Sequence, residues 1–109
     1  MRDRRQEIRM VARIWHGRTS RQKSDEYWRF LQQRAIPDYR STPGNKGAWI
    51  LRRDEGDVSH FPCLTHWESM DVIRNFAGDD IQQAKYYPED RDFLLEFEPY
   101  VNHYEIIGE

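Results

Sequence analysis

The sequence has a single cysteine and no long apolar stretch among its 109 residues. A lone thiol at Cys63 cannot close a disulfide within the chain, which excludes a fold held together by internal disulfide bonds. No basic segment followed by an apolar core opens the sequence, so we expect no secretory signal and a location in the reducing cytoplasm. The apolar runs fall far short of the ~20 residues that a membrane-spanning helix needs, so we expect no membrane partner.

Neither sign of charge dominates the sequence. There are 17 Lys and Arg residues against 19 Asp and Glu residues, which gives a net charge of −2. Nucleic-acid binding requires a basic face, and the one basic cluster, within residues 2–9, is diluted by Asp3 and Glu7. We therefore expect no nucleic-acid partner and interpret residues 1–9 as a flexible N-terminal tail, with Met10 a second candidate for the natural start.

The composition is that of a globular protein, with 38% hydrophobic and 14% aromatic residues. A chain of this length builds one core, so residues 10–109 are predicted to form a single domain. Its first element is a β-prone strand over residues 10–16, which Gly17 ends. A helix over residues 20–35 follows, and Pro37 then disfavours further helical geometry.

The middle of the sequence predicts a loop and a β-hairpin. Residues 41–47 are rich in turn formers and predict the loop. Two β-prone runs, over residues 48–53 and 58–67, are joined by the acidic, glycine-containing residues 54–57. This pattern indicates two antiparallel strands connected by a turn.

The last third of the sequence predicts a short helix between Ser69 and Gly78 and a closing strand over residues 100–107. Between them, within residues 79–99, we expect a second helical piece, with a turn of helix at residues 80–84. The order strand, helix, two strands, helix, strand indicates an α+β ferredoxin-like βαββαβ fold with an antiparallel four-stranded sheet.

Both faces of the predicted sheet carry apolar side chains. In the strand over residues 58–67, Phe61 and Trp67 lie on one face, and Leu64 lies on the other between two histidines. Helices cover one face of such a sheet, so we interpret the other face as packing against the sheet of a second copy in a homodimer. The alternative is a monomer in which these amphipathic side chains remain half-exposed.

Three histidines on predicted strands, His60, His66 and His103, are candidates for a general base. Each could instead be a structural histidine with satisfied hydrogen bonds. Six residues of extended strand separate His60 from His66, about 20 Å, which is too far for both to bind one metal ion. No zinc or haem spacing motif occurs, so we expect neither a metal site nor a cofactor.

Arg13 and Trp15 share one face of the first strand, where a guanidinium could bind an anionic oxygen beside a stacking indole. An ion pair between Arg13 and Glu105 is an equal alternative. Tyr86 and Tyr87 could line the mouth of a pocket or pack against the domain. Cys63 is better interpreted as a core residue than as a nucleophile, because its strand neighbours are apolar.

Several segments together resemble the antibiotic biosynthesis monooxygenase (ABM)-like proteins of bacteria, over residues 10–107. The segments are Met-Val-Ala-Arg-Ile-Trp-His-Gly-Arg (10–18), Pro-Asp-Tyr (37–39), Thr-Pro-Gly-Asn (42–45), Leu-Thr-His-Trp-Glu-Ser (64–69), Phe-Ala-Gly-Asp-Asp-Ile (76–81) and Tyr-Tyr-Pro-Glu-Asp (86–90). The last two segments look like an uncharacterised branch. The resemblance implies a dimeric α/β barrel in which the sheet of each subunit closes over that of the other.

The resemblance also implies an activity, the oxidation of a phenol or quinol by dioxygen without a cofactor. In that hypothesis His103 or His60 removes the phenol proton, Arg13 stabilises the oxyanion, and Trp15 and Trp67 shape a pocket for a small aromatic or polyketide-like compound. His66, Tyr86 and Tyr87 are further candidate binding residues. The alternative is a non-catalytic, small-molecule-binding or stress-response dimer.

Overall fold

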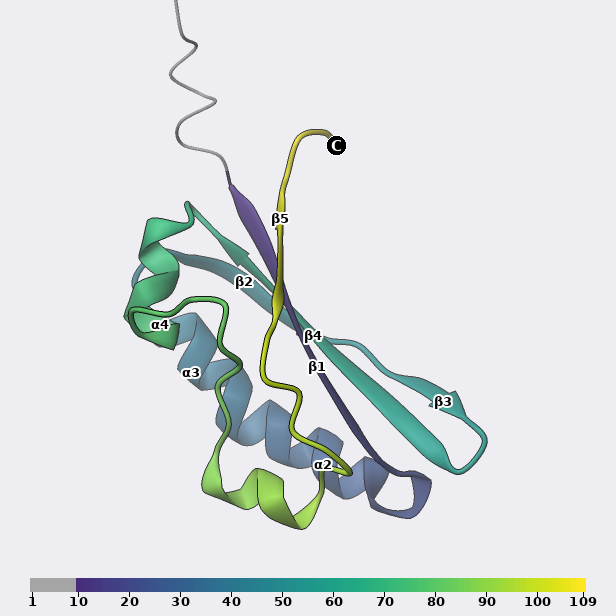
Figure 1. Cartoon of the computed structure of the whole chain (residues 1–109). Helices are drawn as coiled ribbons and strands as arrows, with labels where there is room; N and C mark the ends of the chain where they lie inside the picture. The colour runs from purple at the N-terminus through teal and green to yellow at the C-terminus, as the bar shows by residue number, and fades with distance from the viewer. Residues whose placement is uncertain (1–9) are drawn as a thin grey trace, which may run out of the picture.

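The computed structural model describes residues 10–109, and the predicted tail over residues 1–9 lies outside them. One antiparallel sheet has the order β2-β4-β1-β5, with β3 paired to the end of β4. All helices lie on one face of this sheet (Figure 1). The strands are β1 (Val11–Ser20), β2 (Asn45–Ile50), β3 (Arg53–Glu55), β4 (Val58–Trp67) and β5 (Asn102–Glu105). The helical segments are η1 (Arg21–Lys23), α2 (Ser24–Phe30), η2 (Leu31–Ala35), α3 (Ile36–Ser41), η3 (Asp71–Ile73), α4 (Arg74–Ala77) and η4 (Pro88–Asp92).

Strand β1 does not end at Gly17, contrary to the sequence prediction, but continues to Ser20. Gly17 pairs with Phe61 in the ladder to β4. A Cβ atom at position 17 would lie 2.5 Å from the ring atom Cη2 of Trp15 and 2.9 Å from a methyl group of Leu94. The glycine is therefore required by the indole that lies across it, and it interrupts nothing in the strand.

The first helix also continues past its predicted end, because a π-helical turn precedes Pro37. Within η2 the bonding pattern widens, so that the Ile36 N–H donates to the carbonyl of Leu31. Ile36 itself keeps helical dihedral angles, with φ of −59° and ψ of −48°. A widened turn absorbs the clash and the missing donor that proline brings to a regular helix. The prediction that Pro37 ends the helix is wrong for this reason.

The predicted strand over residues 48–53 is divided into β2 and β3 by a proline on the neighbouring strand. Leu51 donates its N–H to the carbonyl of Pro62 at 2.7 Å. Pro62 has no N–H with which to return the bond, so the ladder breaks between β2 and β3. The loop before β2 is shorter than predicted, since β2 begins at Asn45.

Downstream of α4 the chain is mostly extended. Gly78 ends α4 with a φ of +87°, as the sequence predicts. The predicted turn of helix over residues 80–84 is present as a single turn, in which the Gln83 N–H donates to the carbonyl of Asp80, and the chain then pairs with the approach to β5. Ala84 donates its N–H to Pro99, and Gln82 accepts a hydrogen bond from the N–H of Val101. The expected second helical piece is η4, and the closing strand is shorter than predicted.

The two long strands alternate between a buried and a half-buried face over their whole length. The helix-facing side of β4 includes Phe61 and Trp67, both fully buried, and the other side includes Leu64. This confirms the predicted assignment of side chains to faces and the ferredoxin-like α+β fold. None of the helices within residues 10–109 is long and apolar enough to cross a membrane.

Candidate functional site

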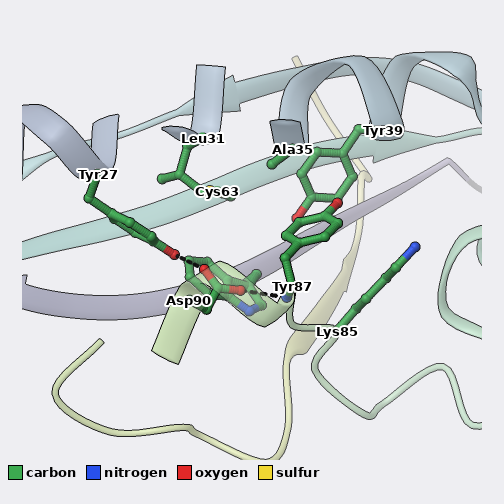
Figure 2. A pocket seen from close by; sticks show the side chains of 9 residues that line it. Tyr27, Leu31, Ala35, Tyr39, Cys63, Lys85, Tyr87 and Asp90 are labelled. Carbon is green, nitrogen blue, oxygen red and sulfur yellow. Dashed lines mark hydrogen bonds between the residues drawn. The ribbon is translucent and has the colours of Figure 1, made fainter. Parts of the chain in front are cut away.

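A small cavity lies between the helix-facing side of the sheet and the first helix. It is lined by Trp15, Tyr27, Leu31, Ala35, Tyr39, Cys63, Lys85, Tyr87 and Asp90, of which all except Trp15 are labelled in Figure 2. Its volume, about 10 Å³, accommodates roughly one water molecule. The interior is therefore aromatic but nearly filled.

The segment that closes this cavity is fastened to α3 through one carboxylate. Asp38 accepts a hydrogen bond from the Tyr87 hydroxyl at 2.6 Å and one from the Lys85 ammonium at 3.1 Å. Burial acts to raise the pKa of Asp38, but these two hydrogen bonds, together with the charges of Lys85 and Arg34, outweigh it and lower the pKa. The guanidinium of Arg34 lies 4.3 Å from the centre of the Tyr87 ring. Lys85 and Tyr87 thus form one wall of the cavity and are held against α3.

A second connection runs through Asp90, whose side chain is 1% exposed. Its carboxylate accepts hydrogen bonds from the Tyr27 hydroxyl at 2.8 Å and from the backbone N–H of Tyr87 at 2.7 Å (Figure 2). Burial raises the pKa of Asp90 and also that of Tyr27. Asp90 therefore stabilises the first turn of η4 and also connects η4 to α2.

Next to this cavity, Arg13 and His103 are direct neighbours across the β1–β5 ladder. Arg13 is 1% exposed, and its Nη2 donates to the carbonyl of Gln83 at 3.1 Å. Its Nε is buried without a partner, and none of the ion pairs within residues 10–109 includes Arg13. The Nε2 of His103 is likewise buried and unpartnered. Burial and the charge of Arg13 lower the pKa of His103, which favours neutral imidazole.

The structure brings some of the sequence-predicted site residues together. Trp15 lies on the same face of β1 as Arg13, and its Nε1 is also buried without a partner. Its ring meets that of Tyr86 edge-on, with 5.9 Å between centroids. Arg13, Trp15, His103, Tyr86 and Tyr87 all belong to the helix-facing side of the molecule.

Two of the other predicted residues lie on the opposite face, and the third, Trp67, lies in the core on the helix-facing side. His60 and His66 project from the opposite face of β4. There the Nδ1 of His60 is 3.0 Å from the Nε2 of His16, whose Nδ1 is 2.5 Å from a carboxylate oxygen of Glu98. Trp67 is 0% exposed and donates from Nε1 to the Thr65 hydroxyl, as a core residue does.

Sequence reasoning did not single out Tyr27, Tyr39, Lys85 and Asp90 as candidate site residues. A signal was nevertheless present, since Tyr39 and Asp90 lie in the Pro-Asp-Tyr and Tyr-Tyr-Pro-Glu-Asp segments on which the family resemblance rests. Within residues 10–109, no three His, Cys, Asp or Glu side chains are grouped so that they could hold a metal ion.

The lowered pKa of His103 predicts how stability depends on pH. A histidine whose pKa is lower in the folded state than its ordinary value of 6.5 stabilises the fold above that pH, and this contribution is lost as the pH falls through the folded-state pKa. We expect the free energy of unfolding to decrease as the pH is lowered from about 7.5 to about 5.5, and His103→Gln to flatten that decrease. Urea unfolding at several pH values measures it. An unchanged slope in His103→Gln, with His66→Gln as the comparison, would contradict the assignment.

No protein-family profile matches the sequence, and no curated protein is significantly similar to it. Solved structures do match. The NE2512 protein of unknown function from Nitrosomonas europaea aligns with a TM-score of 0.66 at 12% identity, covering 94% of this chain and 92% of its own. A proposed antibiotic biosynthesis monooxygenase from Bacillus cereus aligns with a TM-score of 0.63 at 13% identity, covering 93% and 96%. Rv0793 from Mycobacterium tuberculosis aligns with a TM-score of 0.60 at 16% identity, covering 92% of this chain and 97% of its own.

These alignments cover nearly all of each chain, so the fold and its connectivity are shared throughout. The class that the fold defines is the α+β ferredoxin-like proteins. Within that class, the resemblance to ABM-like proteins is supported by the Bacillus cereus structure at the level of the fold.

Proposed function

We propose that the protein is a cofactor-independent monooxygenase that acts on a small aromatic or polyketide-like phenol at the helix-facing site. The observation that carries the proposal is the pairing of a buried guanidinium with a neutral imidazole, since Arg13 and His103 are ladder neighbours and each has an unpartnered buried nitrogen. The aromatic side chains of Trp15, Tyr86 and Tyr87 around them suit a flat, apolar substrate.

In the proposed reaction His103 accepts the phenol proton, and Arg13 stabilises the phenolate oxygen. The electron-rich ring carbon then forms a bond with one atom of dioxygen. Loss of the hydrogen on that carbon and cleavage of the O–O bond leave a quinone carbonyl, and the second oxygen atom departs as water. The substrate supplies all four electrons that reduce dioxygen. His60 is a weaker candidate for the base, because it lies on the other face of the sheet, away from Arg13.

The alternative, a protein that binds a small molecule without oxidising it, is favoured by the closed interior. A cavity of about 10 Å³ admits no aromatic substrate unless lining side chains such as those of Lys85 and Tyr87 move. Such a closed site fits a protein that sequesters its ligand. Tight stoichiometric binding with no consumption of oxygen would identify this role.

The proposed activity is tested by oxygen uptake with a panel that includes the phenol 1-naphthol and anthrone, the keto tautomer of a phenol. We expect uptake with one or more of them, and a loss of about 100-fold or more in His103→Gln, in line with the usual contribution of a general base. His60→Gln and His66→Gln serve as controls on the opposite face and are expected to keep the activity. Equal rates in His103→Gln and His66→Gln would overturn the assignment of the base.

We further propose that the protein is a homodimer whose subunits meet through the face of the sheet that carries no helix. That face presents Ile14, Leu64 and Tyr104 on three neighbouring strands, and Trp49 is 50% exposed beside them. A contiguous apolar surface of this kind on a small domain marks an interaction site. Two identical faces related by a twofold axis would cover each other.

A further inference from the structure

A groove lies at the edge of the sheet, next to the proposed site and beside β5. Its volume is about 480 Å³, within the range of sites for small molecules. Apolar walls come from Met70, Ile81, Tyr100 and Val101, and polar groups come from Gln82 and His103. The interior cavity, at about 10 Å³, could not hold the same ligand.

The inner wall of this groove is in direct contact with Arg13. His103 lines the groove and is the ladder neighbour of Arg13 on β5. Gln82 also lines the groove, and the carbonyl of the next residue, Gln83, accepts the one hydrogen bond that the Arg13 side chain makes within residues 10–109. Arg13 does not itself line the groove, but it is bonded to the neighbour of one polar wall residue, Gln82, and paired with another, His103.

Charge decides what kind of ligand suits such a groove. A buried guanidinium is costly unless an opposite charge accompanies it, and here a neutral carbonyl and the face of the Phe76 ring, 5.6 Å away, are the partners observed. In the part of the chain that the structure describes, the Nε of Arg13 is a hydrogen-bond donor without a partner, and the Nε2 of His103, a residue that lines the groove, has no partner either. The absence of a negative charge beside Arg13 within residues 10–109 and the two nitrogens without partners both favour an anionic oxygen as the group that binds here.

We propose that the groove beside β5 binds small aromatic monoanions, with a carboxylate or phenolate oxygen directed at Arg13 and His103 and the ring lying on Met70, Ile81 and Tyr100. Tyr100 is 64% exposed and Met70 is 40% exposed, so both present apolar surface to an incoming ring. The inference rests on the binding role proposed for Arg13 and His103, but it does not require that the ligand be oxidised.

Binding of 2-naphthoate and of 2-naphthamide, measured by isothermal titration calorimetry on the full-length protein, tests the proposal. The two probes share a ring and differ in charge. We expect naphthoate to bind at least tenfold more tightly in the unaltered protein, since charge-assisted hydrogen bonds are available only to the anion. Arg13→Gln is expected to remove that preference, and Met70→Ser to weaken both probes alike.

Leu95→Ser is the matched control, because Leu95 is an exposed apolar residue, 52% exposed, that does not line the groove. It is expected to leave both affinities unchanged. If Arg13→Gln does not fold, the His103 imidazole provides a second readout by NMR. A bound anion opposes the charge of Arg13, so saturation with naphthoate is expected to raise the pKa of His103, whereas naphthamide leaves it unchanged.

Equal affinity for the two probes, or equal losses in Met70→Ser and Leu95→Ser, would overturn the groove proposal. The outcomes also separate it from the proposed oxidation. Preferential naphthoate binding in a protein that consumes no oxygen would support the groove proposal and contradict the proposed monooxygenase activity. Oxygen uptake with phenols, in a protein that shows no preference for the anion, would support the monooxygenase and contradict the groove proposal.

Discussion

Replacing Trp67 by alanine is expected to lower the free energy of unfolding by about 3–5 kcal/mol. Trp67 is 0% exposed at the end of the central strand β4. Its ring centroid lies 6.0 Å from that of Phe76, so it joins the sheet to α4. Its Nε1 donates to the Thr65 hydroxyl at 2.8 Å, and truncation removes this bond as well as the packing. Chemical denaturation at a fixed protein concentration measures the change.

Trp28→Ala is the matched control for this substitution. Trp28 lies on α2 and is 45% exposed, so its truncation removes less buried surface and is expected to cost about 1 kcal/mol or less. Similar losses in the two variants would show that Trp67 is not the packing centre that its burial indicates.

Replacing Leu64 by glutamate is expected to convert the proposed dimer into a monomer at micromolar concentration, with a rise of about 100-fold or more in the dissociation constant. Leu64 lies mid-strand on β4, between Ile14 on β1 and Trp49 on β2, and its side chain projects from the face without helices. An unpaired carboxylate in the middle of an apolar interface carries a large desolvation cost. Light scattering coupled to size-exclusion chromatography compares the mass with the 13.3 kDa of one chain.

The control for this experiment is Leu95→Glu, which places the same charge at an exposed position outside the two long strands. It is expected to keep the mass of the unaltered protein. A monomeric mass for the unaltered protein would contradict the dimer itself. A dimer that survives Leu64→Glu would show that the subunits meet through another surface.

The order of elements was predictable from sequence because strand and helix periodicity are local properties. The alternation along β4, with Phe61 and Trp67 opposite Leu64, could be assigned to faces correctly for the same reason. The errors at Gly17 and Pro37 have a common cause. Both residues usually end an element. Here the ring of Trp15 occupies the space beside Gly17, and a π-helical turn accommodates Pro37.

The site was predictable only in part. Arg13 and Trp15 could be placed on one strand face, but which face the helices cover is a tertiary property. His60 was therefore a candidate base on equal terms with His103, and His66 a candidate binding residue. The bonds that close the cavity join residues far apart in the chain. Tyr27 and Asp90 are 63 positions apart, and Asp38 and Tyr87 are 49 apart. Patterns among neighbouring residues of the sequence cannot predict such pairs.

The contact between Trp15 and Gly17 has a consequence for how this fold could change in evolution. The indole lies along its own strand over a residue without a side chain, and it also forms part of the cavity wall. A smaller residue at position 15 would enlarge the interior by most of the volume of the indole while the backbone stays in place. One side chain thus sets most of the volume of the interior, so a single substitution at position 15 could give a descendant protein a cavity for a larger ligand.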